Sequence, residues 1–240
     1  MVDTIISLTT LPSRLHKIKP CIDSLRLQNF PVYVWIPEKV ERTGDVFDGN
    51  IPEFLKKKNI FVAIVNDYGP ITKLVPALNI NTKYIITSDD DIIYSRQWSE
   101  MLLKHKKLLE NNALCYRGRI FTDKNNKRYE RTKTVRGVEK PTSVDILTGV
   151  RGAVYNRSFF GDDFYDFKNL YETKFADDVW ISGYLAKKGI GRLCVPRPIN
   201  NTKNIHDVKK IDALYKINWK RNNKFQHNNN TIIEYFKKYW

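Results

Sequence analysis

Short apolar runs alternate with segments of helical spacing through the first half of the chain. The runs are rich in Val, Ile, Tyr and Phe and end in turn residues, which is typical of strands buried in a sheet. We expect these strands at residues 2–9, 32–37, 60–65 and 83–87. We expect helices at about 15–25, interrupted at Pro20, and at 52–58, 71–79 and 96–111. Strands that alternate with helices predict an α/β fold whose mainly parallel sheet is flanked by helices.

The chain has the length of one large domain or two small ones. Its 240 residues are 42% apolar and 12% aromatic, which is ordinary for a globular protein with a substantial core. No apolar run is long enough to cross a membrane, and the first ten residues lack the pattern of a secretion signal. We therefore expect a cytoplasmic protein in which Cys21, Cys115 and Cys194 are reduced and buried, because their wide spacing fits no zinc site.

The formal net charge of +15 calls for an explanation. It results from 41 basic and 26 acidic residues, and such a charge attracts phosphate groups, nucleic acids and anionic membranes. No basic helix with base-reading residues, zinc finger or RNA-recognition motif accompanies it. A diphosphate-bearing substrate and a simple compositional bias toward Lys both remain open, and no nucleic-acid partner is expected.

Polar residues that could carry chemistry follow the predicted strands. Ligands of open α/β sheets bind beyond the carboxyl ends of the strands, so these residues should meet at one edge. The residues in question are Thr9, Thr10 and Arg14 after the first strand, Asp67 and Lys73 after the third, and Asp89, Asp90 and Asp91 after the fourth.

The three consecutive aspartates lie between apolar pairs in the sequence ITSDDDIIY at 86–94. Carboxylates crowded there would repel one another, and Mg²⁺ or Mn²⁺ would relieve the repulsion while leaving coordination positions for a diphosphate. An ordinary polar turn or helix cap explains the triplet equally well. The triplet alone does not decide between the two interpretations.

A second acidic pair, Asp177 and Asp178, opens a predicted helix in the sequence FADDVWISGYLAKKGIG at 175–191. Acidic residues in the first turn of a helix need no function, because the helix dipole stabilises them by about 0.3 to 1 kcal/mol. A carboxylate fixed there becomes a general base if burial or an acidic neighbour raises its pKa. Taken alone, this motif favours the structural role.

The order of the motifs resembles a known family. TTLPSR, GPITKL, SDDD, TGVRGAVY at 148–155, ADDVW and a late His206 follow one another over about residues 4–207. Together they resemble the nucleotide-sugar-dependent glycosyltransferases of the GT-A fold, which carry a DxD metal site on a Rossmann-like sheet. The resemblance implies one GT-A domain at 1–198, with a nucleotide-binding half at about 1–94 and an acceptor half at about 95–198, followed by a segment at 199–240.

The resemblance also assigns a role to each matching residue. Residues for the nucleotide and the rest of the donor are Thr9, Thr10, Arg14, Asp67, Lys73, Asp89 and Asp90. Ligands of a Mn²⁺ or Mg²⁺ ion are Asp89, Asp91 and His206, although a lone histidine is as often structural. Gly149 and Gly152 mark a loop where donor sugar and acceptor meet. Asp178 matches the usual general base, and Asp177 stays open as the alternative because the family commonly has Glu at that position.

These roles predict a metal-dependent glycosyltransferase that moves a sugar from a nucleotide-sugar donor to a hydroxyl of a glycan or another acceptor. A UDP-sugar donor follows from the habit of the family, and an Asp base predicts inversion at the anomeric carbon. One alternative is a metal-dependent phosphoryl or nucleotidyl transferase, although its usual GxxxxGK[ST] and GxGxxG loops are missing. The other is a non-enzymatic, basic nucleic-acid-binding domain.

The segment 199–240 is basic and aromatic. Its nine Lys and Arg against three Asp and Glu give a formal charge of +6. Lysines interleaved with aromatic rings suit peripheral contact with an anionic membrane. Alternatively, Ile232, Ile233 and Phe236 pack a closing helix against the sheet while the lysines stay in solvent. The small number of apolar residues and their helical spacing favour the closing helix.

Overall fold

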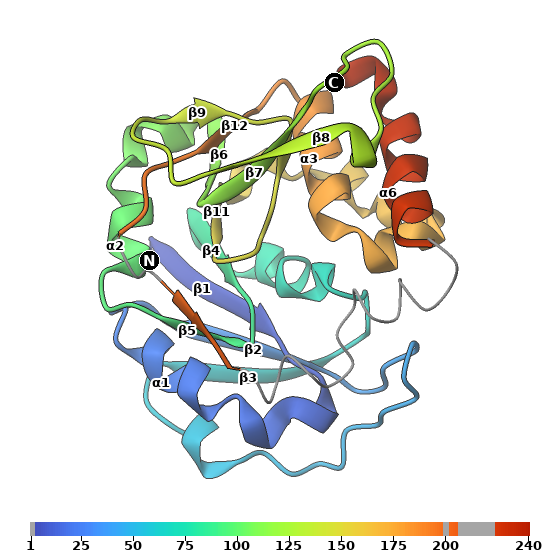
Figure 1. Ribbon diagram of the computed structural model, residues 1–240. Helices are drawn as coiled ribbons and strands as arrows, with labels where there is room; N and C mark the ends of the chain where they lie inside the picture. Colours follow the sequence, from blue (N-terminus) through green and yellow to red (C-terminus); the bar gives the residue numbers. More distant parts are fainter. Residues whose placement is uncertain (1–2, 199–201, 206–223) are drawn as a thin grey trace.

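The computed structural model describes residues 3–198, 202–205 and 224–240 and has an α/β architecture (Figure 1). The strands are β1 Thr4–Thr9, β2 Val32–Pro37, β3 Ile60–Val65, β4 Tyr84–Ser88, β5 Ile92–Tyr94, β6 Asn112–Cys115, β7 Arg117–Phe121, β8 Thr132–Arg136, β9 Thr142–Ser143, β10 Ile146–Leu147, β11 Ala153–Asn156, β12 Gly191–Cys194 and β13 Thr202–Asn204. The α-helices are α1 Lys19–Arg26, α2 Trp98–Leu103, α3 Asp177–Lys187 and α6 Lys224–Tyr235. Short 3-10 helices occupy Pro12–Lys17, Glu53–Leu55, Ile71–Lys73, Pro76–Asn79, Lys106–Glu110, Tyr129–Arg131, Arg157–Phe159, Asp162–Asn169, Tyr171–Phe175 and Lys237–Tyr239.

The main sheet is mostly parallel, as the sequence predicts. Its eight strands have the order β3-β2-β1-β4-β11-β6-β12-β9. Strands β1 to β4 are mutually parallel, β12 is parallel to β6, and β11 runs antiparallel between β4 and β6. A second, antiparallel sheet has the order β10-β7-β8, and β13 pairs with β5. The chemistry-bearing ends of β1 to β4 therefore lie along one edge.

Both faces of the main sheet are covered. Successive side chains of a strand point to opposite faces, so Ile6 of β1 enters a core with α1 and α2, whereas its neighbour Ile5 enters a core with α3 and α6. All three cysteines are buried and unpaired, as expected. Within the described residues, no helix has the length and apolar character that a membrane crossing requires.

Three helical predictions are wrong in detail. The helix expected at 52–58 is only the short 3-10 helix Glu53–Leu55. The helix expected at 71–79 is two 3-10 turns, because Pro76 lacks the amide hydrogen that a continuous helix would use and restricts the residue before it. The long helix expected at 96–111 is α2 followed by the separate turn Lys106–Glu110. The break expected at Pro20 is confirmed, since a 3-10 turn ends at Lys17 and α1 begins at Lys19.

The C-terminal part of the chain forms the expected closing helix. Ile232, Ile233 and Phe236 are buried in the same core as α3, and Figure 1 shows α6 in red beside α3 in orange. The ring of Phe236 lies 4.9 Å from that of Trp180. A Cβ atom on Gly183 would come within 2.2 Å of the Phe236 ring, so the close contact requires glycine on α3.

Candidate active site

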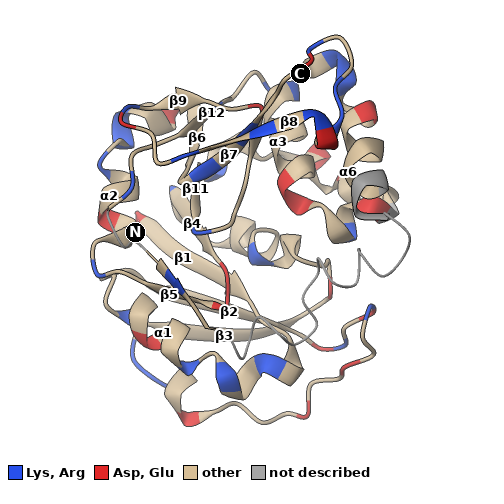
Figure 2. Ribbon diagram, viewed as in Figure 1, with Lys and Arg blue, Asp and Glu red and all other residues tan. Residues whose placement is uncertain are grey.

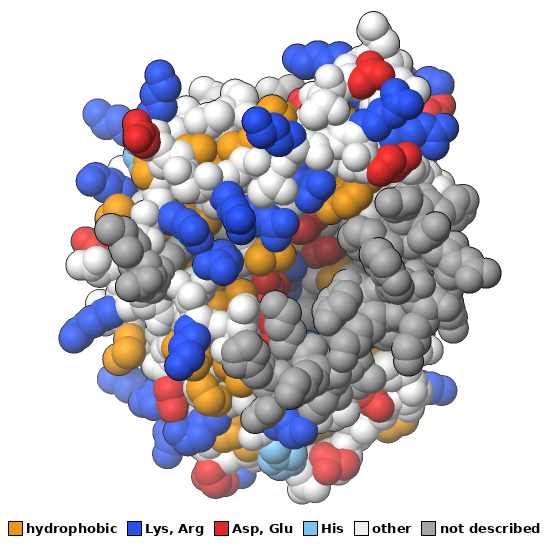
Figure 3. Space-filling view, in the orientation of Figure 1, with side chains coloured by type: hydrophobic (Ala, Val, Ile, Leu, Met, Phe, Trp, Pro, Cys, Tyr) orange, Lys and Arg blue, Asp and Glu red, His pale blue; other side chains and the backbone are white. Residues whose placement is uncertain are grey.

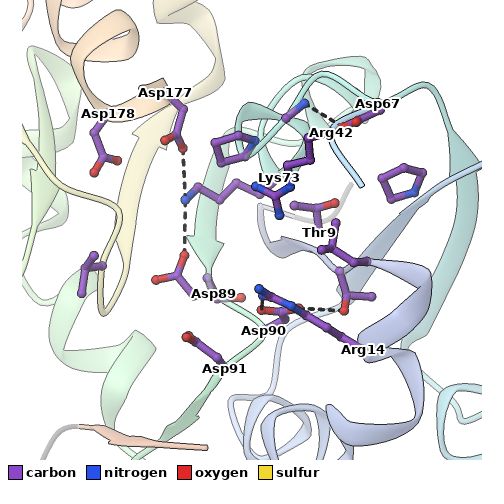
Figure 4. A pocket seen from close by; sticks show the side chains of 17 residues that line it. Thr9, Arg14, Arg42, Asp67, Lys73, Asp89, Asp90, Asp91, Asp177 and Asp178 are labelled. Atoms are coloured by element: carbon purple, nitrogen blue, oxygen red, sulfur yellow. Dashed lines mark hydrogen bonds and ion pairs between the residues drawn. The ribbon is translucent and has the colours of Figure 1, made fainter. Parts of the chain in front are cut away.

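A cavity of about 320 Å³ opens at the carboxyl ends of the parallel strands. Six aspartates and three basic side chains line it, which gives an acidic interior to a basic protein. The lining residues are Thr9, Thr10, Leu11, Arg14, Pro37, Arg42, Asp67, Gly69, Pro70, Lys73, Ser88, Asp89, Asp90, Asp91, Val150, Asp177 and Asp178. The two acidic motifs, which lie far apart in the sequence, thus meet in one hollow (Figures 3 and 4).

Asp90 is a structural member of the triplet. Its side chain is buried and accepts hydrogen bonds from Thr10 Oγ1 at 2.7 Å and Arg14 Nη1 at 3.2 Å. Burial raises the pKa of Asp90, and the charge of Arg14 and the Thr10 hydrogen bond oppose the rise. All three residues line the cavity where the donor was expected to bind, and the contacts of Thr10 and Arg14 with Asp90 fix the loop after β4.

Tyr94 fixes the same loop from the other side. The backbone NH of Asp89 donates to the Tyr94 hydroxyl at 2.7 Å, and this hydroxyl lies 3.2 Å from the Asp89 carbonyl oxygen, which can accept its hydrogen. Asp89 and Asp91 flank the buried Asp90, and their side chains are partly exposed in the cavity. Because Asp90 is held inside the protein, Asp89 and Asp91 lie at the cavity, where a ligand can reach them.

Lys73 joins the two acidic motifs. Its Nζ lies 3.3 Å from Asp89 Oδ1 and 3.2 Å from Asp177 Oδ2, and only 9% of its side chain is exposed (Figure 4). Burial alone would lower the pKa of Lys73, but the charges of Asp177, Asp89 and Asp178 outweigh burial and raise it well above the ordinary value. Lys73 is therefore a permanent cation between β4 and α3.

Asp178 has a raised pKa, which suits it to act as a base near neutral pH. Burial and the neighbouring charge of Asp177 raise the pKa of Asp178 to about 7, although Lys73 and the hydrogen bond from Gly149 oppose the rise. The Gly149 NH donates to Asp178 Oδ1 at 2.8 Å, and the carboxylate is partly exposed to the cavity. A carboxylate with a pKa near neutrality can accept a proton from a bound hydroxyl at physiological pH.

Helix α3, which carries this pair, is tied to the second sheet. The Leu147 NH donates to Ser182 Oγ at 3.0 Å, and Ser182 Oγ donates to the Asp178 carbonyl oxygen at 2.7 Å. The first turn of the helix is thus fixed relative to β10 and to the loop that follows it. The position of Asp178 depends on packing as well as on helix capping.

The loop at 149–152 holds Asp178 but only one of its two glycines lies against the acidic pair. A Cβ on Gly149 would lie 3.0 Å from Lys73 Nζ and 3.2 Å from Asp178 Oδ1, so a larger residue there would press on both charged groups. Gly152 does not line the cavity. It has φ of +112°, and a Cβ there would come within 2.5 Å of the Trp98 ring. Gly152 therefore packs against Trp98, and its expected role in a loop where donor sugar and acceptor meet stays a prediction.

Asp67 and Thr9 line the cavity, but their side chains form hydrogen bonds with backbone groups of the protein. Asp67 accepts hydrogen bonds from the backbone NH groups of Gly69 at 2.8 Å and Glu41 at 3.0 Å. Thr9 Oγ1 donates to the Trp35 carbonyl oxygen at 3.0 Å. Both residues shape the loops after β1 and β3, which was not apparent from the sequence.

The carboxylates suit a hard divalent cation in part. Among the described residues, no three side chains of His, Cys, Asp or Glu are grouped so that they could hold a metal ion. Mg²⁺ nevertheless commonly binds through one or two carboxylates, with water and substrate phosphates as the other ligands. Asp89 and Asp91 can supply that smaller set. The predicted third ligand, His206, lies outside the described residues.

Arg42 and Val150 also line the cavity and were not predicted from the sequence. Arg42 lies in the loop after β2 and lines the cavity on the side of Asp67 (Figure 4). The rule that ligands bind beyond strand ends points to this loop as much as to the loops after β1, β3 and β4, so the signal was present. Val150 carries no chemical signal, and only the fold brings it to the cavity.

No family model matches the chain, and no curated protein is significantly similar to it in sequence.

Proposed function

We propose that this protein is a metal-dependent glycosyltransferase of the GT-A type, which transfers a sugar from a nucleotide diphosphate donor to an acceptor hydroxyl. One observation carries the proposal. A partly exposed aspartate whose pKa is raised to about 7, Asp178, shares a cavity with the carboxylates of Asp89 and Asp91 and with the buried cation of Lys73. A base, a cation for the leaving group and ligands for a diphosphate-bound metal ion are the parts that such a transfer requires.

Asp178 is the base in this proposal. The acceptor oxygen forms a bond to the anomeric carbon of the donor, the bond from that carbon to the diphosphate oxygen breaks, and its electron pair leaves with the nucleoside diphosphate. The proton of the acceptor hydroxyl passes to Asp178. Because the Gly149 NH already binds Oδ1, the other carboxylate oxygen is left to receive the proton. A single displacement of this kind inverts the anomeric configuration.

Lys73 stabilises the leaving diphosphate. Negative charge develops on the leaving oxygen in the transition state, and a fixed cation in a site sheltered from water is an effective way to stabilise it. The raised pKa of Lys73, which follows from Asp177, Asp89 and Asp178 despite burial, keeps it charged throughout the reaction. Asp177 holds Lys73 in place at 3.2 Å, which is a positioning role.

Asp89 and Asp91 would hold a Mg²⁺ or Mn²⁺ ion, which when bound offsets the charge of the diphosphate. UDP is the nucleotide that the resemblance suggests. The acidic excess in the cavity supports this assignment, because a diphosphate would be repelled by these carboxylates without a bridging cation.

Isothermal titration of UDP and GDP with and without Mn²⁺, followed by a panel of nucleotide sugars, tests the proposal. We expect binding that requires Mn²⁺ and release of a nucleoside diphosphate when an acceptor is present. Asp178→Asn should retain nucleotide binding and lose transfer by about two to four orders of magnitude. Asp177→Asn is the matched variant, and a loss of transfer confined to it would make Asp177 the base.

The pH dependence provides an independent check. Since Asp178 must be unprotonated to act, transfer should rise with pH through about 7 and level off above it. Release of a nucleoside monophosphate and pyrophosphate in place of a nucleoside diphosphate would identify a nucleotidyl transferase. Binding of single-stranded DNA without any nucleotide binding would rule out both enzymes.

A further inference from the structure

Four arginines gather beside the cavity without taking part in it. We call them the arginine cluster: Arg117 of β7, Arg136 of β8, Arg151 of the loop at 149–152, and Arg197 after β12. Arg117 and Arg136 are direct partners in the antiparallel pairing of β7 with β8. None of the four lines the acidic cavity. Figure 2 shows basic positions along β7 and β8, and Figure 3 shows basic side chains gathered next to the acidic hollow.

The arginine cluster has no ion-pair partner among the residues that the structure describes. Within the part of the chain that the structure describes, no carboxylate forms an ion pair with any of the four guanidinium groups, and Arg117 Nε is buried without a hydrogen-bond partner. Arg119, two residues after Arg117 on β7, shows the contrast: its guanidinium donates to Thr132 Oγ1 and Thr134 Oγ1. The four arginines are thus available to an external ligand.

Their mutual repulsion is unfavourable in the protein alone. Like charges placed directly opposite each other across two strands are destabilising. Burial lowers the pKa of Arg151, and the charges of Arg197, Arg117 and Arg136 lower it further. A bound anion would remove this repulsion, and arginine is the side chain best suited to hold phosphate or carboxylate through paired hydrogen bonds.

The backbone of Arg151 adds an independent observation. Arg151 has φ of +76°, a left-handed conformation that costs a residue with a Cβ about 1 to 2 kcal/mol. Two hydrogen bonds hold this turn: Trp98 Nε1 donates to the Arg151 carbonyl oxygen at 2.7 Å, and the Gly152 NH donates to the Gly149 carbonyl oxygen at 2.8 Å. Strain of this kind that the surroundings hold in place is typical of functional positions.

The same turn connects the arginine cluster to the proposed base. Gly149, at its start, binds Asp178, and Thr148 just before it donates to the Arg117 carbonyl oxygen through both its NH and its hydroxyl, each at 3.0 Å. A molecule bound by the arginines therefore lies next to the carboxylate that would deprotonate it. All four arginines fall within residues 95–198, the half of the chain that the resemblance assigns to the acceptor. The molecule that they bind would therefore be the acceptor.

We propose that the arginine cluster binds an anionic group, a phosphate or a carboxylate, on the acceptor, so that this protein glycosylates acidic acceptors. The identification of the bound molecule as the acceptor rests on the proposed function, whereas the anion site itself does not. The cluster holds the acidic group while a hydroxyl of the same molecule reaches Asp178. Neutral acceptors lack this anchor and bind weakly.

The test compares three sugars that share one ring: glucose 6-phosphate, glucuronate and glucose. Each is titrated into the full chain by calorimetry with saturating UDP and Mn²⁺, and again without them. We expect glucose 6-phosphate or glucuronate to bind at least tenfold more tightly than glucose, because a hydrogen bond to a charged group is worth about a factor of ten. The stronger of the two identifies the anionic group.

Variants of the exposed Arg136 locate the site. Arg136→Gln should weaken the acidic sugar about tenfold and leave the affinity for UDP unchanged, and Arg136→Lys should restore part of the loss. Lys133→Gln is the matched control. It removes the same charge from an exposed residue three positions along β8, on the opposite face, and should change nothing. Melting temperatures confirm that each variant is folded.

Three results would overturn the proposal. The first is equal binding of acidic and neutral sugars. The second is a loss in Arg136→Gln no larger than in Lys133→Gln, and the third is an equal loss of UDP affinity in Arg136→Gln, which would assign the arginines to the donor. Absence of UDP binding would instead refute the glycosyltransferase, while the titrations without UDP would still decide whether the arginines form an anion site.

Discussion

Replacing Asp178 by Asn should make the folded protein more stable while it removes the proposed base. Asn keeps the shape of the side chain and the oxygen that accepts the hydrogen bond from Gly149 at 2.8 Å. It removes a charge that the fold disfavours, because burial and Asp177 raise the pKa of Asp178 from 3.8 to about 7. The raised pKa that suits Asp178 to act as a base is therefore also the reason why replacing it stabilises the fold.

The raised pKa fixes the sign and the size of the effect. The folded protein binds a proton at Asp178 more tightly than the unfolded chain does, so its stability is fully present below pH 3.8 and is lost as pH rises through about 7. The difference between 3.8 and about 7 corresponds to roughly 4 kcal/mol. Above pH 8 the variant should exceed the parent by an amount of this order, and below pH 4 the two should be nearly equal.

Urea unfolding at a series of pH values, without divalent cations, measures the difference. The midpoint should separate between parent and variant as pH rises from 4 to 8, with an unchanged slope. Asp163→Asn is the control: hydrogen bonds and ion pairs with Tyr184, Lys188 and Lys187 outweigh burial and lower the pKa of Asp163, so this variant should be less stable than the parent by a nearly constant amount across this range. A constant difference between the parent and Asp178→Asn across this range, or an Asp178→Asn variant less stable than the parent at pH 8, would refute the reasoning.

Three further predictions follow from the same cavity and core. Lys73→Met should destabilise the protein by about 3 to 5 kcal/mol at pH 8 in urea unfolding, because Asp89 and Asp177 lose their buried partner; a loss below 1 kcal/mol would contradict the bridging role. Asp91→Ala should leave the melting temperature nearly unchanged and abolish Mn²⁺-dependent UDP binding in calorimetry, so retained Mn²⁺ dependence would exclude it as a ligand. Phe236→Ala should lower the unfolding free energy by about 3 to 5 kcal/mol without increasing salt-sensitive binding to anionic vesicles. Vesicle binding that falls in this variant, with stability unchanged, would favour the membrane role of the C-terminal segment.

The sequence was most informative where one local pattern is sufficient. Strands β2 and β3 begin and end at the predicted residues because both are uninterrupted apolar runs bounded by turn residues. Strand β11 was not predicted, and it could not be. Its four residues are too few for a periodic pattern, and its place between β4 and β6 depends on pairings with residues far away in the chain.

The sequence predicted which residues lie at the candidate site, but it did not predict the contacts that each side chain makes. Strand-end position identified Lys73 and the aspartate triplet as neighbours, and the cavity contains them. Sequence could not show that Asp90 turns inward to Arg14, because ion pairing between residues 76 positions apart leaves no local pattern. It could not find the arginine cluster either, since the register of β7 with β8 decides which basic residues face one another.

The packing of α6 behind α3 sets an order of events during synthesis. The strands that carry Asp89 and Asp91 are complete by about residue 94, whereas α3 is fixed against Phe236. At roughly 5 to 20 residues per second, the ribosome needs about 7 to 28 seconds to make the chain between residue 94 and Phe236. A nascent chain can therefore form the half that carries Asp89 and Asp91 well before the helix with Asp178 is anchored, and the proposed base takes its final position only after α6 has emerged.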